Sequence, residues 1–374
     1  SRSEFKVMLD MPQKRCSDTR HYPCDVDAVT PDQWEAIVAS FDDGVIDQTL
    51  SFGAASWGRE RLSHLVVRDG HSVVGACQVV LLKPPVPGAG LAHVKFGPLW
   101  RRGEGPSEPH LRATLQFLVD EYVQRRQMYL RIMPPACEKG SSIITEQLAD
   151  LGFARTPVPD ADRYVLDLAY TPTELRARMK SKWRYHLKKA EQHGLTVLHG
   201  SDVDHVEEFL GLYSAMRQRK TFADSRAVGK LSEIMAGLPA GLGTTVWLCR
   251  AGNIPLAGAI VSHIGDTAVY LFGATNDKGR DARAGYLLHW AIIQGLREHG
   301  CRWYDLGGSC DEPGLHQFKS GLLGRHGTVL RLPGYFDLSA HAFNAVAVRS
   351  MLKAKDAIEP IRALLGQSND ANTR

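Results

Sequence analysis

Two similar stretches, LVVRDGHSVVGACQV (65–79) and WLCRAGNIPLAGAIV (247–261), decide the fold. Each reads as two apolar strands joined by a short turn that contains a glycine, Gly70 in the first stretch and Gly252 in the second. A small residue followed by glycine between apolar runs is typical of a β-hairpin. Because the repeat recurs at a very large spacing, it indicates two copies of one domain rather than a solenoid.

The sequence around each hairpin predicts the same order of elements: strand, helix, strand, helix, strand. In the first half these elements are expected at 91–99, 108–127, 129–133, 141–151 and 163–168. In the second half they are expected at 267–273, 284–298, 303–306, 313–323 and 328–331. This order predicts an α/β class with a mixed sheet in each half.

The domain division follows from the repeat, and 374 residues suit two domains of ordinary size. We expect the first domain over 1–168, completed by a C-terminal helix over 339–365, and the second over 169–338. The second domain is entered through a basic helix over 172–193, with a proline near its first turn and Gly194 just beyond its end.

Composition bounds the class of protein. Hydrophobic residues make up 44% and charged residues 23% of the chain, which is ordinary for a globular protein, and the net charge is only +4. The seven cysteines are dispersed without a Cys-x-x-Cys pair, so we expect neither a disulfide framework nor a metal site. Without a signal peptide or an apolar run long enough to cross a bilayer, the sequence predicts a soluble, cytoplasmic protein.

The basic helix carries seven cations between 176 and 189 with no acidic residue among them. These are Arg176, Arg178, Lys180, Lys182, Arg184, Lys188 and Lys189, and Trp183 and Tyr185 lie among them. Like charges this close repel one another, so a polyanion such as RNA is one expected partner. The alternative is a solvated face over a buried stripe of Met179, Trp183, Leu187 and Ala190.

Several motifs, in this order, resemble the Fem family of non-ribosomal aminoacyltransferases over roughly residues 50–337. The motifs are KFGPLW (95–100), KSKWRYHLKKAEQHGLTV (180–197), Arg219-x-x-Phe222, YLFGAT (270–275), GYLLHWAII (285–293), YDLGG (304–308) and GLHQFKSGLLG (314–324). The resemblance implies two tandem GNAT-like domains, a cleft for a precursor peptide and a channel for the acceptor end of aminoacyl-tRNA.

The resemblance also implies roles for single residues. Lys319 and Tyr270 match catalytic positions; Arg219, Phe318, Arg59 and Phe272 match substrate-binding positions; and Lys180, Lys182, Arg184, Lys188 and Lys189 match the basic helix that would contact tRNA. Lys319 suits the chemistry because a compact cation can stabilise the oxyanion formed when an ester becomes an amide. Phe272 departs from relatives that carry a second tyrosine, and Arg59 is the weaker match, which leaves the acceptor open.

Each residue also has a structural interpretation. Lys319 and Arg219 are read alternatively as helix-surface residues, and Tyr270 as a packed aromatic of an alternating strand. Asp305 is expected to cap the glycine turn that follows it rather than to act as a base. His289 is expected in the core or on the surface of its helix, and no Ser-His-Asp, Cys-His or metal constellation is found.

Three functions remain open. The first is transfer of an amino acid from aminoacyl-tRNA to an amine of a peptidoglycan-precursor-like or small acceptor, with no cofactor besides that co-substrate. The second is an acyl-CoA-dependent N-acyltransferase, which RDARAG (280–285) disfavours because Arg283 occupies the position of the central glycine of a pyrophosphate loop. The third is a non-catalytic RNA- or polysaccharide-binding protein. The sequence does not predict the oligomeric state.

Overall fold

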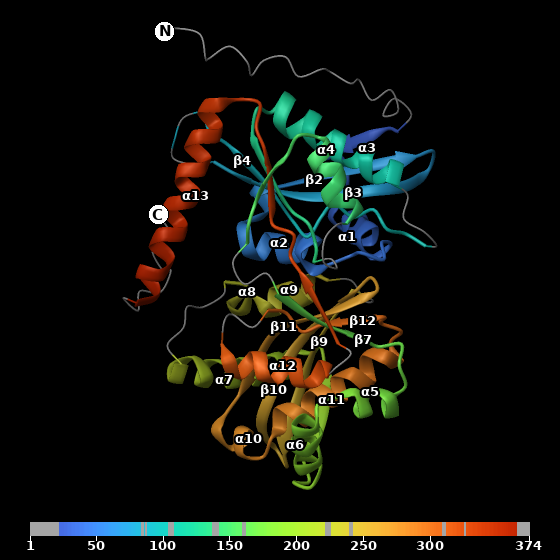
Figure 1. Cartoon of the computed structure of the whole chain (residues 1–374), viewed down its shortest axis with the longest axis vertical. Helices are drawn as coiled ribbons and strands as arrows, with labels where there is room; N and C mark the ends of the chain where they lie inside the picture. Colours follow the sequence, from blue (N-terminus) through green and yellow to red (C-terminus); the bar gives the residue numbers. More distant parts are fainter. Residues whose placement is uncertain are drawn as a thin grey trace.

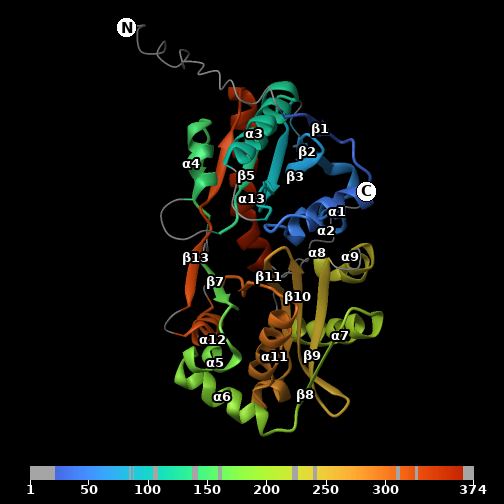
Figure 2. The ribbon, with the colours of Figure 1, turned by 90° about the vertical axis from the view of Figure 1, so that its right-hand side faces the viewer.

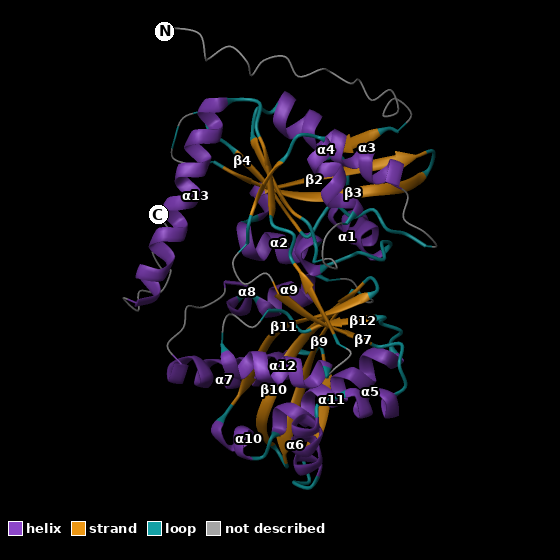
Figure 3. Ribbon diagram, viewed as in Figure 1, coloured by secondary structure: helices purple, strands orange, loops and turns teal. Residues whose placement is uncertain are grey.

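The computed structural model describes residues 22–83, 86, 88–103, 108–136, 142–158, 162–220, 226–238, 242–308, 312–324 and 327–364, with backbone alone at 219–220, 226–227 and 355–364. Two α/β units are stacked along the long axis of the molecule (Figure 1). Each unit has one seven-stranded mixed sheet flanked by helices (Figure 3). The predicted fold class, two mixed-sheet units, is confirmed.

The first sheet has the strand order β1-β2-β3-β4-β5-β14-β6. Its strands are β1 (Cys24–Val26), β2 (Leu62–Asp69), β3 (Ser72–Leu82), β4 (Leu91–Lys95), β5 (Tyr129–Met133), β14 (Tyr335–Leu338) and β6 (Ala154–Thr156). The accompanying helices are α1 (Pro31–Ala39), η2 (Ile46–Gln48), α2 (Leu50–Trp57), η3 (Arg59–Arg61), α3 (Glu108–Leu118), the π-helix η4 (Val119–Arg125), α4 (Ile143–Asp150) and α13 (Ala342–Leu364).

The second sheet has the strand order β13-β7-β12-β11-β10-β9-β8. Its strands are β13 (Thr328–Arg331), β7 (Asp162–Asp167), β12 (Trp303–Asp305), β11 (Thr267–Thr275), β10 (Ile254–Ile264), β9 (Gly243–Ala251) and β8 (Thr196–Gly200). The accompanying helices are α5 (Pro172–Arg178), α6 (Ser181–Glu191), α7 (Val203–Lys220), α8 (Arg226–Gly229), α9 (Leu231–Gly237), α10 (Asp277–Asp281), α11 (Ala284–Glu298) and α12 (Pro313–Leu323).

The two sheets correspond strand by strand, in order and in direction. In each, the repeated hairpin is followed by an antiparallel neighbour and then a parallel one. The turns of both hairpins use a glycine with positive φ, 56° at Gly70 and 58° at Gly252, a conformation that costs other residues energy. The expected duplication is therefore present in the backbone as well as in the sequence.

The two halves of the chain exchange one strand each. β7 follows β6 in the chain but pairs with β12 and β13 of the second sheet, and β14 follows β13 but returns to lie between β5 and β6. Figure 2 shows the chain after β13 rising from the lower unit to the upper one. The division at residue 168 assigned strand 163–168 to the first domain, whereas its hydrogen bonds place it in the second sheet. Short-range pattern could not reveal this exchange.

The predicted basic helix over 172–193 is two helices, so that prediction was wrong in part. Thr171 and Glu174 form a capping box at the start of α5. Met179 and Lys180 then leave the helical region, with ψ of 148° and 147°. The N–H of Lys180 donates to the carbonyl of Gly321 in α12, 2.9 Å away, so a tertiary hydrogen bond replaces a helical one.

Strand β4 ends earlier than expected, at Lys95 instead of residue 99. The next residue, Phe96, has a φ of 53°, which takes the chain out of the extended conformation. Leu99 then pairs with Ala76 as an isolated bridge, so the predicted segment keeps contact with the sheet without continuing the strand.

The two units share an apolar interface. Trp34 and Leu50 of the first unit belong to one buried cluster with Ile234, Leu242 and Ile264 of the second. Polar contacts close its edge: Asp266 N–H donates to the carbonyl of Asp42 over 2.8 Å, and Arg101 pairs with Asp266 over 3.1 Å. The interface brings α2 beside α9.

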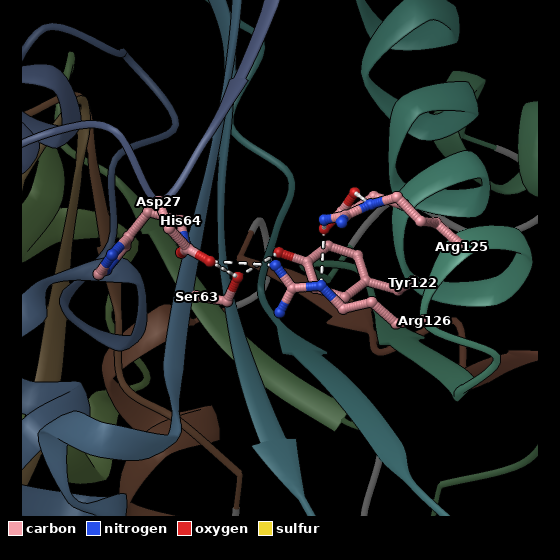
Figure 4. A network of polar contacts seen from close by, with 7 residues as sticks. Asp27, Ser63, His64, Tyr122, Arg125 and Arg126 are labelled. Carbon is pink, nitrogen blue, oxygen red and sulfur yellow. Dashed lines mark hydrogen bonds and ion pairs between the residues drawn. The ribbon is translucent and has the colours of Figure 1, made fainter.

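A network of polar contacts connects several elements within the first unit (Figure 4). Ser63 lies 3.0 Å from Asp27 and 2.7 Å from the hydroxyl of Tyr122, and Arg126 donates to Asp27 over 3.0 Å. Burial opposes the charge on Asp27, but these bonds and one from the His64 N–H outweigh it and lower the pKa of that carboxyl. The network joins the ends of β1 and η4 to the start of β2.

In the described part of the chain, no helix combines the length and apolarity needed to cross a bilayer. Within the same residues, no group of three or more histidine, cysteine, aspartate or glutamate side chains is placed to hold a metal ion. The described cysteines, Cys24, Cys77, Cys249 and Cys301, are free thiols.

Candidate active site

The parallel pair β11/β12 separates after three paired residues, from Thr267↔Trp303 to Val269↔Asp305. Beyond that point β11 stays with β10 as far as Thr275. The chain after Asp305 instead follows β7, since Leu306 N–H donates to the carbonyl of Tyr164 over 2.8 Å. We call this divergence the fork. It lies between the third and fourth strands of the seven-stranded sheet.

Lys319 reaches the fork from α12. Its side chain is buried, and its ammonium donates a hydrogen bond to the carbonyl of Gly308, which lies just past the end of β12. The same nitrogen lies 5.8 Å from the centre of the Tyr270 ring on β11. The interpretation of Lys319 as a solvated surface lysine is therefore wrong. The buried ammonium of Lys319 therefore lies between the two arms of the fork.

His289 of α11 lies beside this lysine. Its Nδ1 is 3.2 Å from the hydroxyl of Tyr304, and its ring is 5.1 Å from that of Tyr270. Burial, and then the charge of Lys319, lower the pKa of His289 to about 3, while burial raises the pKa of Tyr270 to about 12. Both groups are neutral near pH 7, so the positive charge of this cluster is on Lys319.

A β-bulge separates two predicted site residues, Tyr270 and Phe272. The pairing with β10 slips between Ile260↔Phe272 and Val261↔Tyr270, which leaves Leu271 as the extra residue. Tyr270 consequently packs with the Lys319 side of the sheet, whereas Phe272 packs on the opposite side, 6.4 Å from Tyr213. In a regular strand, residues two apart share a face. The resemblance assigned both residues to the site, whereas the structure places their side chains on opposite faces of the sheet.

Phe318 belongs to an aromatic group next to Lys319. Its ring lies 5.2 Å from His289, 5.1 Å from Tyr286 and 5.8 Å from Trp183. Tyr286, Tyr304 and His289 were not predicted as site residues. The sequence did offer a signal for them. Tyr286 and His289 lie in the motif GYLLHWAII (285–293), and Tyr304 lies in the motif YDLGG (304–308).

The basic helix α6 exposes most of its predicted cations. Lys180, Lys182, Lys188 and Lys189 are exposed, while Trp183, Leu187 and Ala190 form the expected buried stripe. Arg184 differs from them, because its guanidinium donates to the carbonyls of Ala177 and Met179 at the end of α5. The stripe and the cationic face therefore coexist on one helix.

Asp305 has the structural role expected from the sequence. One carboxylate oxygen accepts the N–H of Gly307 over 2.7 Å, and the other accepts from Arg163 over 2.8 Å. It thereby fixes the turn whose next residue, Gly308, binds Lys319.

The remaining predicted residues lie apart from the fork. Arg59 lies on η3 of the first unit and lines a pocket of about 320 Å³ at the interface. The pocket is lined by Leu50, Ser51, Ala54, Ala55, Arg59, Glu233 and Gly237, from α2, η3 and α9. Arg219 lies near the end of α7, but its side chain, like Phe222, is outside the described residues.

The FemAB family model matches residues 54–227, and the acetyltransferase (GNAT) domain model matches residues 177–320, which contain most of the fork. The resemblance to the Fem family is confirmed. The tandem GNAT-like architecture of this Fem-like chain is likewise established.

Solved structures show the same fold. The crystal structure of FemX superposes with a TM-score of 0.70 at 17% identity, covering 92% of this chain and all of that chain. The C-terminal domain (DUF2156) of a putative lysylphosphatidylglycerol synthetase from Agrobacterium fabrum superposes with a TM-score of 0.57 at 13% identity, covering 86% of this chain and 96% of that one.

Curated relatives include the lipid II:glycine glycyltransferase of Staphylococcus aureus, 33% identical over 61 residues. That match spans 16% of this Fem-like chain and 14% of the relative. The similarity to this relative is therefore limited to a short stretch of each protein.

Proposed function

We propose that this chain is an aminoacyltransferase that moves an amino acid from aminoacyl-tRNA to an amine of a peptidoglycan-precursor-like or small-molecule acceptor. The observation that carries the proposal is the burial of Lys319 in the fork, with its ammonium between Gly308 and Tyr270. The match to the Fem family and the name of the staphylococcal glycyltransferase support the same class of reaction.

In the proposed reaction the amine nitrogen attacks the ester carbonyl carbon, and the carbonyl oxygen becomes an oxyanion. The bond from carbon to the ribose oxygen then breaks, the amide forms, and the proton released by the amine ends on the ribose hydroxyl. An ester in the fork would place its carbonyl near Lys319, whose ammonium has three donor hydrogens. Removing one oxyanion donor of this kind typically costs about 3–4 kcal/mol of transition-state stabilisation.

Tyr270 and His289 fit supporting roles in this scheme. Tyr270 remains protonated near pH 7, so its hydroxyl is available as a donor to the substrate rather than as a base. His289 is neutral and adds no repulsion to Lys319. We assign no residue as general base, because the free amine can attack once it has lost its proton to solvent.

The acceptor would enter from the first unit. The interface pocket offers Arg59 for a phosphate or carboxylate and Glu233 for an ammonium group, above an apolar floor that includes Leu50 and Ala54. Arg219 and Phe272 are further candidates for acceptor binding, carried by the resemblance. The donor would bind along α6 through Lys180, Lys182, Arg184, Lys188 and Lys189, and we place the reaction in the cytoplasm, where charged tRNA is found.

Acyl-CoA is the second candidate donor. Arg283, the residue before α11, has a φ of 59°, which is the conformation that glycine normally supplies in a phosphate-binding turn. The GNAT model match also covers this turn. Against this donor, Arg283 places a large side chain where such turns carry glycine.

The test is a transfer assay with charged tRNA and an amine acceptor, run with and without ribonuclease, and in parallel with acyl-CoA. We expect amide formation that ribonuclease abolishes and that Lys319→Met loses while RNA binding persists. Turnover that survives ribonuclease and needs acyl-CoA would replace the donor. RNA binding without turnover in any condition would favour a non-catalytic binding protein.

A further inference from the structure

The proposed reaction moves a proton that the three side chains already described at the fork are not suited to carry. After the amine attacks the ester carbon, its nitrogen must lose a proton and the ribose oxygen must gain one. Lys319 is already charged, and Tyr270 keeps its proton because burial raises its pKa to about 12. Burial, and then the charge of Lys319, lower the pKa of His289 to about 3, so His289 takes up no proton near pH 7. A carrier of this proton is therefore expected at the exposed rim of the fork.

His316 lies at that rim. It precedes Lys319 by three residues on α12, so the two side chains share one face of the helix. His316 is exposed, whereas Lys319 is buried. The Nδ1 of His316 lies 2.5 Å from the hydroxyl of Tyr164 on β7, and the two form a hydrogen bond. Among the described residues no second hydrogen bond holds this imidazole, which leaves its Nε2 for a substrate.

Tyr164 connects the imidazole to the arm of the fork that Lys319 also contacts. The Tyr164 N–H donates to the carbonyl of Gly307 over 3.2 Å. The next residue, Gly308, accepts the hydrogen bond from the ammonium of Lys319. The Tyr164 side chain is buried, which fixes the position of its hydroxyl. One arm of the fork therefore holds both the cation and the imidazole.

The Tyr164 hydroxyl suits a partner that changes its protonation state. A tyrosine hydroxyl both donates and accepts hydrogen bonds, so it can accept from an Nδ1–H while Nε2 gains or loses a proton. The ring then keeps its place in both forms. On α12 the neighbouring charged residues are Glu312, one turn before His316, and Lys319, one turn after it. Imidazole is also the ordinary side chain that exchanges protons most readily near neutral pH.

We propose that His316 carries this proton: its Nε2 accepts the proton from the amine nitrogen after attack and donates it to the ribose oxygen as the carbon–oxygen bond breaks. The proposal rests on the proposed aminoacyl transfer and adds a second group to Lys319. One N–H bond breaks, one O–H bond forms, and the imidazole returns uncharged to its starting state. The amine still loses its first proton to solvent, so His316 acts only after the attack. Tyr164 is the positioning residue of the pair.

The test measures transfer by the full chain from total tRNA charged with labelled amino acids to methoxyamine, a small amine that stays uncharged where imidazole titrates. The rate kcat is followed between about pH 5.5 and 8 for the wild type and His316→Asn. We expect wild-type kcat to rise with pH, because only an uncharged imidazole accepts a proton. His316→Asn should be about 100-fold slower and lack that rise. Its amide can still bond Tyr164, so a histidine that only anchored α12 would be replaced without loss.

Chemical rescue gives a second measurement that a purely structural role would not change. His316→Ala removes an exposed ring and leaves the Tyr164 hydroxyl, so imidazole added to the solution can take the place of the ring. We expect added imidazole to raise kcat of His316→Ala by about 10-fold and to leave Lys319→Met unchanged. Tyr164→Phe should lower kcat by about 10-fold and keep the pH dependence, because the imidazole is present but no longer held.

The outcomes separate this proposal from the proposed function. Wild-type kcat and pH dependence in His316→Asn, or no rescue of His316→Ala by imidazole, overturn the proton carrier and leave the role of Lys319 intact. Absence of transfer by the wild type counts against the aminoacyl transfer itself and against the carrier with it. The matched control is His341→Asn, an exposed histidine just before α13, which should change neither kcat nor its pH dependence. Thermal melts establish that each variant is folded.

Discussion

The two parallel strand pairs of this molecule occupy equivalent places and differ in one respect. β4 and β5 stay paired over five residues, from Leu91↔Tyr129 to Lys95↔Met133. β11 and β12 part after three. Beside the closed pair, α3 contributes the buried apolar residues Leu111 and Leu115. Beside the open pair, α11 and α12 contribute His289 and Lys319.

The comparison shows how two copies of one fold come to differ at equivalent strand pairs. Where the strands stay paired, their backbone groups satisfy each other and apolar side chains fill the space above them. Where they part, the second unit places a buried lysine against a freed carbonyl, that of Gly308. The polar network of the first unit instead binds its own members together (Figure 4). The first unit is therefore expected to support folding and the acceptor pocket, and the second to carry the chemistry.

The largest effect is expected at the fork. Lys319→Met should lower kcat by about 10²–10³-fold, because an oxyanion would lose its cation. The measurement is transfer of a labelled amino acid from charged tRNA. The matched control is Lys353→Met on α13, where the lysine is exposed and activity should not change. Near-normal turnover in Lys319→Met would remove the distinction between the two strand pairs.

The exchanged strands provide the second test, because each is held by one buried arginine–aspartate pair. Arg131 binds Asp337 in the first sheet over 2.7 Å, and Arg163 binds Asp305 in the second over 2.8 Å. Asp337→Ala and Asp305→Ala should each lower the free energy of unfolding by about 3 kcal/mol, since each leaves a mostly buried arginine unpaired. Denaturant unfolding measures this loss.

Activity separates the same two variants. Asp305→Ala should also lower kcat at a temperature where it is folded, because Asp305 fixes the turn that leads to Gly308. Asp337→Ala should retain kcat. If both variants lost kcat equally, the exchange itself, and not the fork, would control the site.

Two glycines give a third, smaller contrast. A Cβ at Gly75 would lie 1.9 Å from the Oγ1 of buried Thr114, whereas a Cβ at Gly273 would lie 1.6 Å from the hydroxyl oxygen of Tyr270. Gly75→Ala should cost about 1–3 kcal/mol of stability through overpacking. Gly273→Ala should displace the partly exposed Tyr270 and so lower kcat with less loss of stability.

Thermal melts and transfer assays on both alanine variants measure this contrast. Gly211→Ala in α7, where an added Cβ meets nothing within 4 Å, is the control. Unchanged kcat in Gly273→Ala would exclude Tyr270 from catalysis.

The smallest effect concerns pH. The folded chain keeps His289 neutral down to about pH 3, while its ordinary pKa is 6.5, so the unfolded chain binds that proton first as the solution is acidified. Stability is therefore lost as pH falls below 6.5, by about 2 kcal/mol between pH 6.5 and 5 at 1.36 kcal/mol per pKa unit. His289→Gln should remove this contribution and flatten the pH dependence of unfolding.

Asp43 of the first unit should change stability with pH in the opposite direction. Burial raises the pKa of Asp43 from 3.8 to about 6, so its folded form binds the proton more readily and gains stability as pH falls from 6 towards 3.8. Asp43→Asn should make acid unfolding steeper than in the wild type. A shallower curve for Asp43→Asn, or an unchanged one for His289→Gln, would contradict these assignments.

Much of the local structure could be predicted from the sequence. Helix α11 and helix α12 begin and end where their apolar periodicity predicts, at 284–298 and 313–323. The cations and the buried stripe of α6 were also predicted. The break at Met179 was not, because it depends on a hydrogen bond to Gly321 far along the chain. The bulge that parts Tyr270 from Phe272 was missed for a similar reason, since it is defined by pairing with β10.

The sequence by itself determined the repeated hairpins with their glycine turns, the caps and faces of the helices, and the set of reactive side chains, because each depends on neighbours a few residues away. Only the tertiary structure decided that β7 and β14 exchange sheets, that β11 and β12 part, and that Lys319 lies buried where they part. Pairing between distant strands depends on which partners compete for the same hydrogen bonds, and local pattern does not encode that competition.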